Sequence, residues 1–410
     1  MSRHGTRGGI LFALWFFYLV NYLDRAAISI AGPAIMFSLA MQPSDFGMIL
    51  SSFGVGYFLA QIPGGLLADR WGARLVLVVS PLFWALFTGM TGLVSTLAGF
   101  VAVRFCFGLA EGVSQGPTYR AIGESFDSRQ RARALAIVVS AATVAPAIAG
   151  PIVGALLAWS GWRPMFLLLV LPALAAAALS YVLLPRGIAA EPIAASAGER
   201  SEARLEAMLR QPELWLLSAS QFGYNFVTWG YSGWLPSYLA MARGIDLKSI
   251  GLLSGIPYAF GFFGLLAGGV LGSSLFHRHR PHLVASCYVV AGLCLIAAYR
   301  ADSVVLSIAG LSGTAFFLYA GYGPKGAVML DLAPERYRAA YVGVVSTVGQ
   351  SAAVLAPAAI GFLVSASGSF ATGFSLMIAA LFIAAASLLL LIPRLTATPL
   401  ARPNLGHPAP

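Results

Sequence analysis

Charged residues are scarce in this chain. Asp, Glu, Lys and Arg together make up 10% of its 410 residues, whereas a typical soluble domain carries about 25%. The mean hydropathy of +0.81 points in the same direction. These two values exclude an ordinary soluble domain and indicate a chain that is mostly surrounded by an apolar medium.

Cysteine and histidine, two frequent metal ligands, are also few. The cysteines lie in apolar segments without disulfide or metal-ligand spacing, so we interpret them as small core residues. The five histidines lie outside the apolar segments, and the motifs H-E-x-x-H, G-x-S-x-G and the P-loop are absent. We therefore expect no metal site, no cofactor and no enzymatic activity. The cysteines are Cys106, Cys287 and Cys294.

What the chain does contain is a series of long apolar runs. A helix needs about 20 apolar residues to cross a bilayer, and twelve runs reach roughly that length. The sequence therefore predicts an all-α, multi-pass membrane protein with twelve transmembrane helices in contact with lipid. The predicted spans are 10–36, 46–68, 75–94, 97–119, 134–159, 164–184, 213–240, 249–276, 283–299, 303–330, 339–366 and 370–392.

The basic residues predict the orientation of these spans. The N-terminus, the even-numbered loops and the C-terminal tail hold 18 of the 25 Lys and Arg residues, and the opposite side holds four. Since cytoplasmic loops carry the excess of basic residues, both termini should face the cytoplasm. We expect the protein in the inner membrane of a bacterium. The net charge of +10 follows from this topology. No basic stripe is interleaved with aromatic residues, so we expect no nucleic-acid partner.

The second half of the chain repeats the first. The segment "GPTYRAIGESFDSRQRARALAI" from Gly116 aligns with "GPKGAVMLDLAPERYRAAYVGV" from Gly323 at a constant offset of 207 residues, loop arginines included. Parallel repeats of six helices are typical of transporters that bind substrate near the midplane, between the halves. We predict two six-helix bundles (1–184 and 213–393), a cytoplasmic linker (185–212) and a cytoplasmic tail (394–410), in a chain that functions as a monomer.

Several motifs resemble those of the major facilitator superfamily. The loop "GGLLADRWGAR", from Gly64 to Arg74, fits the superfamily pattern G-x-x-x-D-R-x-G-x-R. In this loop Asp69 can accept hydrogen bonds from a helix N-terminus and pair with basic loop residues, so Asp69, Arg70 and Arg74 are the expected latch of the cytoplasmic side. The second-half loop "GSSLFHRHRP" departs from the pattern because it lacks the aspartate.

Segments in the first, second, fourth and seventh predicted spans resemble one branch of this superfamily, the anion:cation symporters. The similar segments are "NYLDR", "GYFLAQIPGG", "RFCFGLAEG" and "WLPSYL". This branch includes bacterial galactonate, hexuronate, glucarate and phthalate permeases. The resemblance implies that Asp24 and Glu111 carry protons and that Arg25 binds the substrate carboxylate, with Arg104 as a partner of the acids.

The charges within the spans support this interpretation on chemical grounds. Asp24 lies near the middle of the first span, and Arg104 and Glu111, seven residues apart, share one face of the fourth. A buried carboxylate that alternates between a neutral form and an arginine-paired form is suited to proton coupling. The planar fork of Arg25 is suited to a carboxylate. The alternative is a permanent ion pair that only fixes helix packing, although buried pairs are poor stabilisers.

Uncharged polar residues within the spans outline the rest of a cavity. Each of them alone could equally form a hydrogen bond between helices, but as a set they predict a hydroxylated substrate. Lys325 replaces a residue that is apolar or aromatic in the family. It could extend to the membrane interface, or it could be a second anion-binding cation, which would favour a dicarboxylate or phosphorylated substrate. The candidate substrate-binding residues are Arg25, Tyr57, Gln61, Tyr224, Asn225, Gln350 and Lys325.

Together these features predict a proton-coupled symporter of a small organic anion, a sugar acid or a related carboxylate, that works by alternating access. The principal alternative is a drug/proton antiporter of the same superfamily. Such a carrier would favour cations through a lone buried acid, and Arg25 next to Asp24 argues against it.

Overall fold

The computed structural model describes residues 7–185, 208–277, 279–334 and 338–397, and these residues form helices joined by short loops, without a strand. The all-α prediction is confirmed. Most of the predicted linker and tail lies outside the described residues. The helices are α1 (Arg7–Ser38), α2 (Pro43–Trp71), α3 (Ala73–Thr91), α4 (Leu97–Gly112), α5 (Gln115–Ser125), α6 (Ser128–Ser160), α7 (Trp162–Leu183), α9 (Pro212–Met241), α10 (Leu247–Ser273), α11 (Arg280–Arg300), α12 (Val304–Ala320), α13 (Tyr322–Leu332), α14 (Arg338–Gln350), α15 (Ala352–Ser367) and α16 (Phe370–Ala397).

Each predicted span corresponds to one helix or to one pair of consecutive helices. Within the described residues, eleven such segments are long and apolar enough to cross a membrane. The remaining one, α9, has 30 residues but is more polar, because Gln221, Tyr224 and Asn225 lie in its central part. The polarity of α9 is the first sign that it borders an aqueous cavity, since polar side chains are costly where a helix faces lipid.

Three of the spans are interrupted helices. The break between α4 and α5 falls at Val113 and Ser114, that between α12 and α13 at Gly321, and that between α14 and α15 at Ser351. At Gly321 and Ser351 the backbone amides still donate to carbonyls four residues earlier, so these two breaks are local distortions of a continuous helical path. At membrane depth such a break is tolerated where protein or a water-filled cavity surrounds it.

Side-chain caps begin three helices at one end of the bundle. The hydroxyls of Thr96 and Ser303 accept hydrogen bonds from the backbone N–H groups of Gly99 and Leu306. Asp246 caps α10 by accepting from the amides of Ser249 and Lys248. These hydrogen bonds stabilise the carboxylate and lower the pKa of Asp246.

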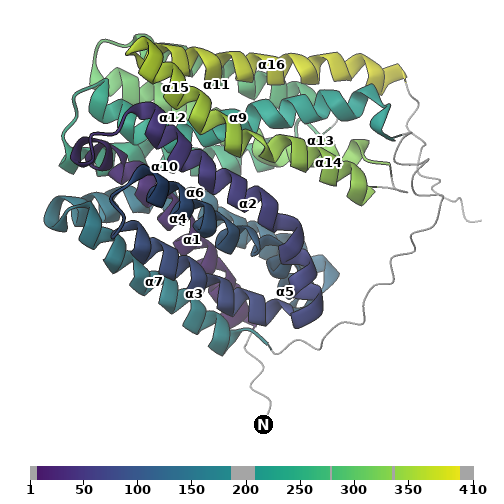
Figure 1. The fold of residues 1–410 in the computed structure, drawn as a ribbon. Coiled ribbons are helices and arrows are strands. Elements are labelled where there is room, and N and C mark those ends of the chain that lie inside the picture. The colour runs from purple at the N-terminus through teal and green to yellow at the C-terminus, as the bar shows by residue number, and fades with distance from the viewer. Residues whose placement is uncertain (1–6, 186–207, 278, 335–337, 398–410) are drawn as a thin grey trace, which may run out of the picture.

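The two halves meet at one end of the molecule and separate at the other (Figure 1). At the closed end, the ring of Phe46 on α2 packs edge-on against Trp234 on α9, with centroids 5.7 Å apart. The amide of Ala358 on α15 donates to the hydroxyl of Ser51 on α2 at 3.0 Å. The open end holds the start of α1, where Arg7 pairs with Asp127 at 3.1 Å. In the orientation predicted from the basic residues, the open end faces the cytoplasm.

Glycines allow α6 and α10 to approach closely near the closed end. A β-carbon added at Gly251 would lie 2.4 Å from the carbonyl oxygen of Gly150, and one added at Gly150 would lie 2.1 Å from that of Gly251. Only glycine fits such a backbone contact, as small residues do at other membrane helix interfaces. This contact joins the first half of the chain to the second.

We therefore predict that Gly251→Leu opens the closed end, because the leucine side chain cannot fit against the backbone of α6. In a variant without native cysteines, spin labels at Ala40 and Ala366 should move apart by several ångströms, as measured by pulsed electron resonance. Gly269→Leu on the same helix is the matched control, since a β-carbon there meets nothing within 4 Å. Equal label distances in both variants would contradict the prediction.

Candidate functional site

A cavity of about 580 Å³ lies between the two halves. Helices of both halves line it, and residues of α5 and α13 near the open end belong to its wall, among them Tyr119 and Met329. Eight of the predicted site residues line this cavity. They are Arg25, Tyr57, Gln61, Arg104, Tyr224, Asn225, Lys325 and Gln350.

The central contact of the site is an ion pair between α1 and α4. Nε of Arg25 donates a hydrogen bond to Oε2 of Glu111 over 2.6 Å. The Arg25 side chain is 15% exposed and lines the cavity, whereas the Glu111 side chain is completely enclosed behind it. Glu111 lies just before the break between α4 and α5. An incoming anion would therefore meet the arginine first and the carboxylate only through it.

The other predicted acid, Asp24, is buried on α1, the helix that also carries Arg25. One carboxylate oxygen accepts a hydrogen bond from the hydroxyl of Thr88 on α3 at 3.4 Å, and the other has no partner among the described residues. Asp24 is 2% exposed and does not line the cavity. The turn of about 100° per helical residue separates it from its neighbour Arg25, so the two side chains take different environments.

Arg104 departs from its expected role as direct partner of the acids. Within the described part of the chain it forms no ion pair, and its guanidinium stacks on Phe107, 4.2 Å from the ring centroid. The reason is geometric: seven residues along a helix correspond to a rise of about 10.5 Å, too far for direct contact with Glu111. The neighbouring helix α1 brings Arg25 to Glu111 instead.

Aromatic rings surround Arg25, and Tyr57 is the one among them that the sequence analysis predicted for the site. Its guanidinium carbon lies 4.6 Å from the ring centroid of Tyr57, 5.1 Å from that of Tyr22 and 5.8 Å from that of Trp229. Such rings attract a cation and keep water away from it. The only sequence signal for Tyr22 and Trp229 was their place beside the polar residues of the same helices.

The second half contributes amides to the wall. The side chain of Asn225 on α9 donates to Oε1 of Gln350 on α14 at 3.0 Å. Gln221 donates to Asn225 at 3.4 Å, one turn away on the same helix. This chain of amides ends at the break between α14 and α15. It can exchange its hydrogen bonds for those of hydroxyl groups on a ligand.

Lys325 does not extend to the membrane interface. The residue is 5% exposed and lines the cavity, with Nζ 3.4 Å from the ring centroid of Tyr224 and 5.2 Å from that of Tyr322. It lies four residues after the break at Gly321, on α13. Of the two alternatives for this residue, the geometry favours the one within the cavity.

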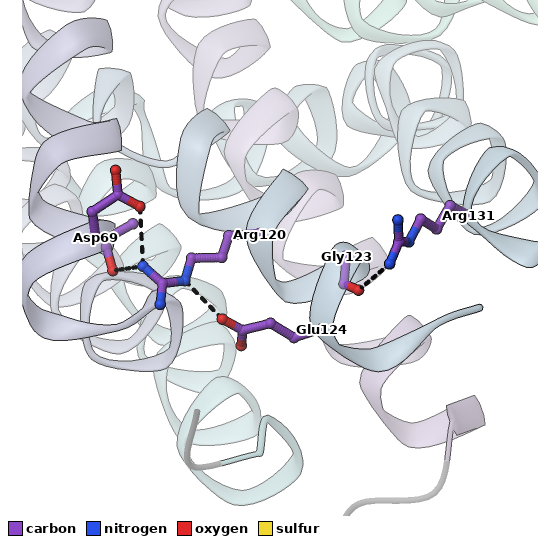
Figure 2. Close-up of polar contacts among 6 residues, drawn as sticks. Asp69, Arg120, Gly123, Glu124 and Arg131 are labelled. Carbon is purple, nitrogen blue, oxygen red and sulfur yellow. Dashed lines mark hydrogen bonds and ion pairs between the residues drawn. The ribbon is translucent and has the colours of Figure 1, made fainter. Parts of the chain in front are cut away.

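The loop motif forms its contacts differently from the expectation. Figure 2 shows Arg120 of α5 between Asp69 of α2 and Glu124 of α5. Nη1 of Arg120 donates to Asp69 at 3.0 Å and to the carbonyl of Ala68 at 2.7 Å, while its Nε donates to Glu124 at 2.7 Å. Asp69 thus ties together two helices of the first half, through an arginine that the sequence analysis did not identify.

Arg70 and Arg74, the predicted partners of Asp69, point elsewhere. Arg70 is exposed, because the neighbouring position of a helix lies about 100° away. Arg74 donates to the backbone carbonyl of Tyr181 near the end of α7 and stacks on the same tyrosine, 4.8 Å from its centroid. The spacing after Gly116-Pro117, which puts Arg120 at the end of the fourth span beside this loop, could have indicated the pairing.

In the second half, a different ion pair joins the corresponding helix ends. Arg280 at the start of α11 pairs with Asp331 at the end of α13 over 2.8 Å, and also donates to the carbonyl of Gly272 at 3.0 Å. The acid that the second-half loop lacks is therefore replaced by one from a different helix. The corresponding acid of the first half, Glu124, binds Arg120.

Comparison with known proteins adds a family and a fold. A family model described as Major Facilitator Superfamily matches residues 14–357. The hexuronate transporter of Bacillus subtilis (strain 168) is 29% identical over 408 residues, which cover 95% of this chain and 94% of the relative. The probable L-galactonate transporter of Escherichia coli (strain K12) is 30% identical, over 87% of this chain and 83% of the relative.

Solved structures with the same fold include a bacterial homolog of the human lysosomal transporter Spinster, in an inward-facing and unoccupied conformation. It superposes with a TM-score of 0.80 at 20% sequence identity, covering 96% of this chain and 99% of that chain. At this identity the likeness concerns the fold.

We predict that Arg120→Gln destabilises the protein by roughly 1–2 kcal/mol, because three acceptors lose a charged donor. Arg70→Gln, on the exposed neighbour of Asp69, should change stability by less than about 0.5 kcal/mol. Thermal unfolding of both variants in the same detergent measures the difference. Equal losses would show that the contacts of Arg120 contribute nothing beyond a surface charge.

Proposed function

Because the chain belongs to the Major Facilitator Superfamily, whose members are membrane transporters, we propose that it is a proton-coupled symporter of an organic anion, a sugar acid or related carboxylate. The printed functions of the relatives, hexuronate and L-galactonate transport, support this class of substrate. The cavity supports it independently: arginine and lysine supply positive charge, and amides and phenols can bind hydroxyl groups.

The observation that carries the proposal is the ion pair between Arg25 and Glu111. As long as Glu111 is ionised, it occupies Nε of Arg25 and neutralises its charge. Protonation of Glu111 removes that charge, and the guanidinium fork then becomes available to a carboxylate in the cavity. Proton and anion therefore favour the binding of each other. The proton releases Arg25 from Glu111, and an anion bound to Arg25 favours protonation of Glu111.

The remaining charges have supporting roles in this scheme. Arg104 lines the cavity beside Phe53, within 5.3 Å of the ring centroid, as Arg25 does at 5.2 Å. It raises the positive potential without binding Glu111 directly. Asp24, buried against α3, is the second site that can take up a proton.

Transport follows from alternating access. In the state described, the contacts of α2 with α15 and of α6 with α10 seal one end, and the cavity reaches toward the other. With both termini in the cytoplasm of a bacterium, this is an inward-open carrier in the inner membrane. Asp69 and Arg120 then lie at the cytoplasmic end, where they hold α2 and α5 together as the halves move.

One prediction from this scheme concerns substrate binding. Arg25→Lys should weaken binding of a hexuronate at least tenfold, because an ammonium cannot form the bidentate contact of a guanidinium. Arg25→Ala should abolish binding. Titration calorimetry of the purified protein measures both, with Arg70→Lys, on the exposed surface, as the matched control. Unchanged affinity in Arg25→Lys would remove this residue from the binding site.

Another prediction from this scheme concerns the coupling of protons to the anion. Glu111→Gln and Asp24→Asn should abolish accumulation of the anion driven by a pH gradient in reconstituted vesicles, because an amide cannot load or release a proton. Counterflow of substrate at equal pH should persist, since exchange does not require return of the empty carrier. Asp302→Asn, an exposed acid, is the control. Variants that still concentrate the anion would mean that these acids are structural.

A further inference from the structure

Lys325 is a cation of the cavity wall that takes no part in the coupling step between Arg25 and Glu111. Its side chain belongs to α13 of the second half and lines the same cavity as Arg25 of the first half. It is one of two lysines in the chain, the other being the exposed Lys248. Within the described residues, its ammonium group is buried and has no hydrogen-bond acceptor.

The aromatic contacts of Lys325 compensate only in part for this burial. An ammonium group has three donors, and a cation over a tyrosine face gains a modest attraction. Burying an unpaired charge costs more free energy than such contacts provide. A bound anion would provide the missing acceptors, while the rings of Tyr224 and Tyr322 hold the lysine in place from the side.

The charge count of the cavity region indicates which kind of anion fits. Two arginines, Arg25 and Arg104, balance the two buried acids of the first half, Glu111 and Asp24. Lys325 is then the cation in excess. When Glu111 takes up its proton, a second positive charge becomes free on Arg25. Two cations are then available, one on each half of the molecule.

We propose that the substrate carries two anionic groups, one bound by Arg25 of α1 and the other by Lys325 of α13. This inference rests on the proposed function. A dianion bound in this way neutralises both free cations and links the two halves, so it stabilises the closing of the cavity around it. A monoanion can bind only one of the two cations and leaves a buried charge unpaired.

The proposal is tested with two pairs of probes that differ in one anionic group. Galactarate and L-galactonate share an open six-carbon hydroxylated chain and carry two and one carboxylates. Sulfoacetate and acetate form a short pair, which distinguishes a sulfonate from a carboxylate as the second group. Titration calorimetry at one pH should show at least tenfold tighter binding of the dianion than of the monoanion in one of the pairs.

The variants then assign the preference to Lys325. Lys325→Gln should reduce affinity for the preferred dianion at least tenfold and change that for its monoanion less than twofold. Lys325→Arg should retain the preference, and the control Lys248→Gln should match the unmodified protein. Equal losses for both probes would mean that Lys325 only braces the tyrosines, and the proposal would fail. It would also fail if Lys325→Gln changed neither affinity.

A second measurement does not depend on the folding of a Lys325 variant. In Lys248→Gln, Lys325 is the only lysine, and mass spectrometry can follow its modification by an amine-reactive reagent. The dianion should protect Lys325 from modification, and the monoanion should not; equal modification with and without the dianion would overturn the proposal. Binding of anions that requires Arg25 but is indifferent to Lys325 would leave the proposed function standing, whereas binding of no probe would overturn both.

Discussion

A charge placed within a membrane protein needs a partner, and the pair between Arg25 and Glu111 is where this constraint shapes the molecule. Glu111 is completely enclosed, so its ionised form depends on the guanidinium 2.6 Å away. Arg25 in turn is held among aromatic rings and touches the cavity on one side. Buried ion pairs contribute little to stability. We therefore propose that this pair is an exchange site, in which a proton binds Glu111 when a substrate anion binds Arg25.

The helices around this pair also determine the shape of the cavity beside it. The break at the end of α4 and the breaks at Gly321 and Ser351 lie close to Glu111, Lys325 and Gln350 respectively. Interrupted helices put polar groups at membrane depth in transporters. The glycine contact of α6 with α10 and the hydrogen bonds of α2 with α15 hold the halves together at the far end. The result is a cavity that is sealed at one end and has charged and amide side chains in its wall.

The two halves share a plan but differ in chemistry. The first half contributes two acids and two arginines, whereas the second contributes amides, tyrosines and one lysine. Even the equivalent corners at the open end differ, because Asp69 pairs with Arg120 in the first half and Asp331 with Arg280 in the second. Repetition supplied the scaffold, and the side chains that face the cavity diverged within it.

The sequence by itself determined the helices and the chemistry available to them. Long apolar runs between polar loops allow few alternatives in lipid, so the bounds of α1 and α9 were predicted to within a few residues. Charges such as Asp24 and Glu111 were conspicuous because so few occur in the spans. Only the tertiary structure decided the pairing: Arg104 shares a helix with Glu111 but lies two turns away, while Arg25 reaches it from α1. In the same way, the structure shows Arg120 as the partner of Asp69, whereas the sequence had indicated Arg70 and Arg74. Periodicity reports which residues share a face of one helix, whereas contacts between helices depend on crossing geometry that a single sequence does not encode locally.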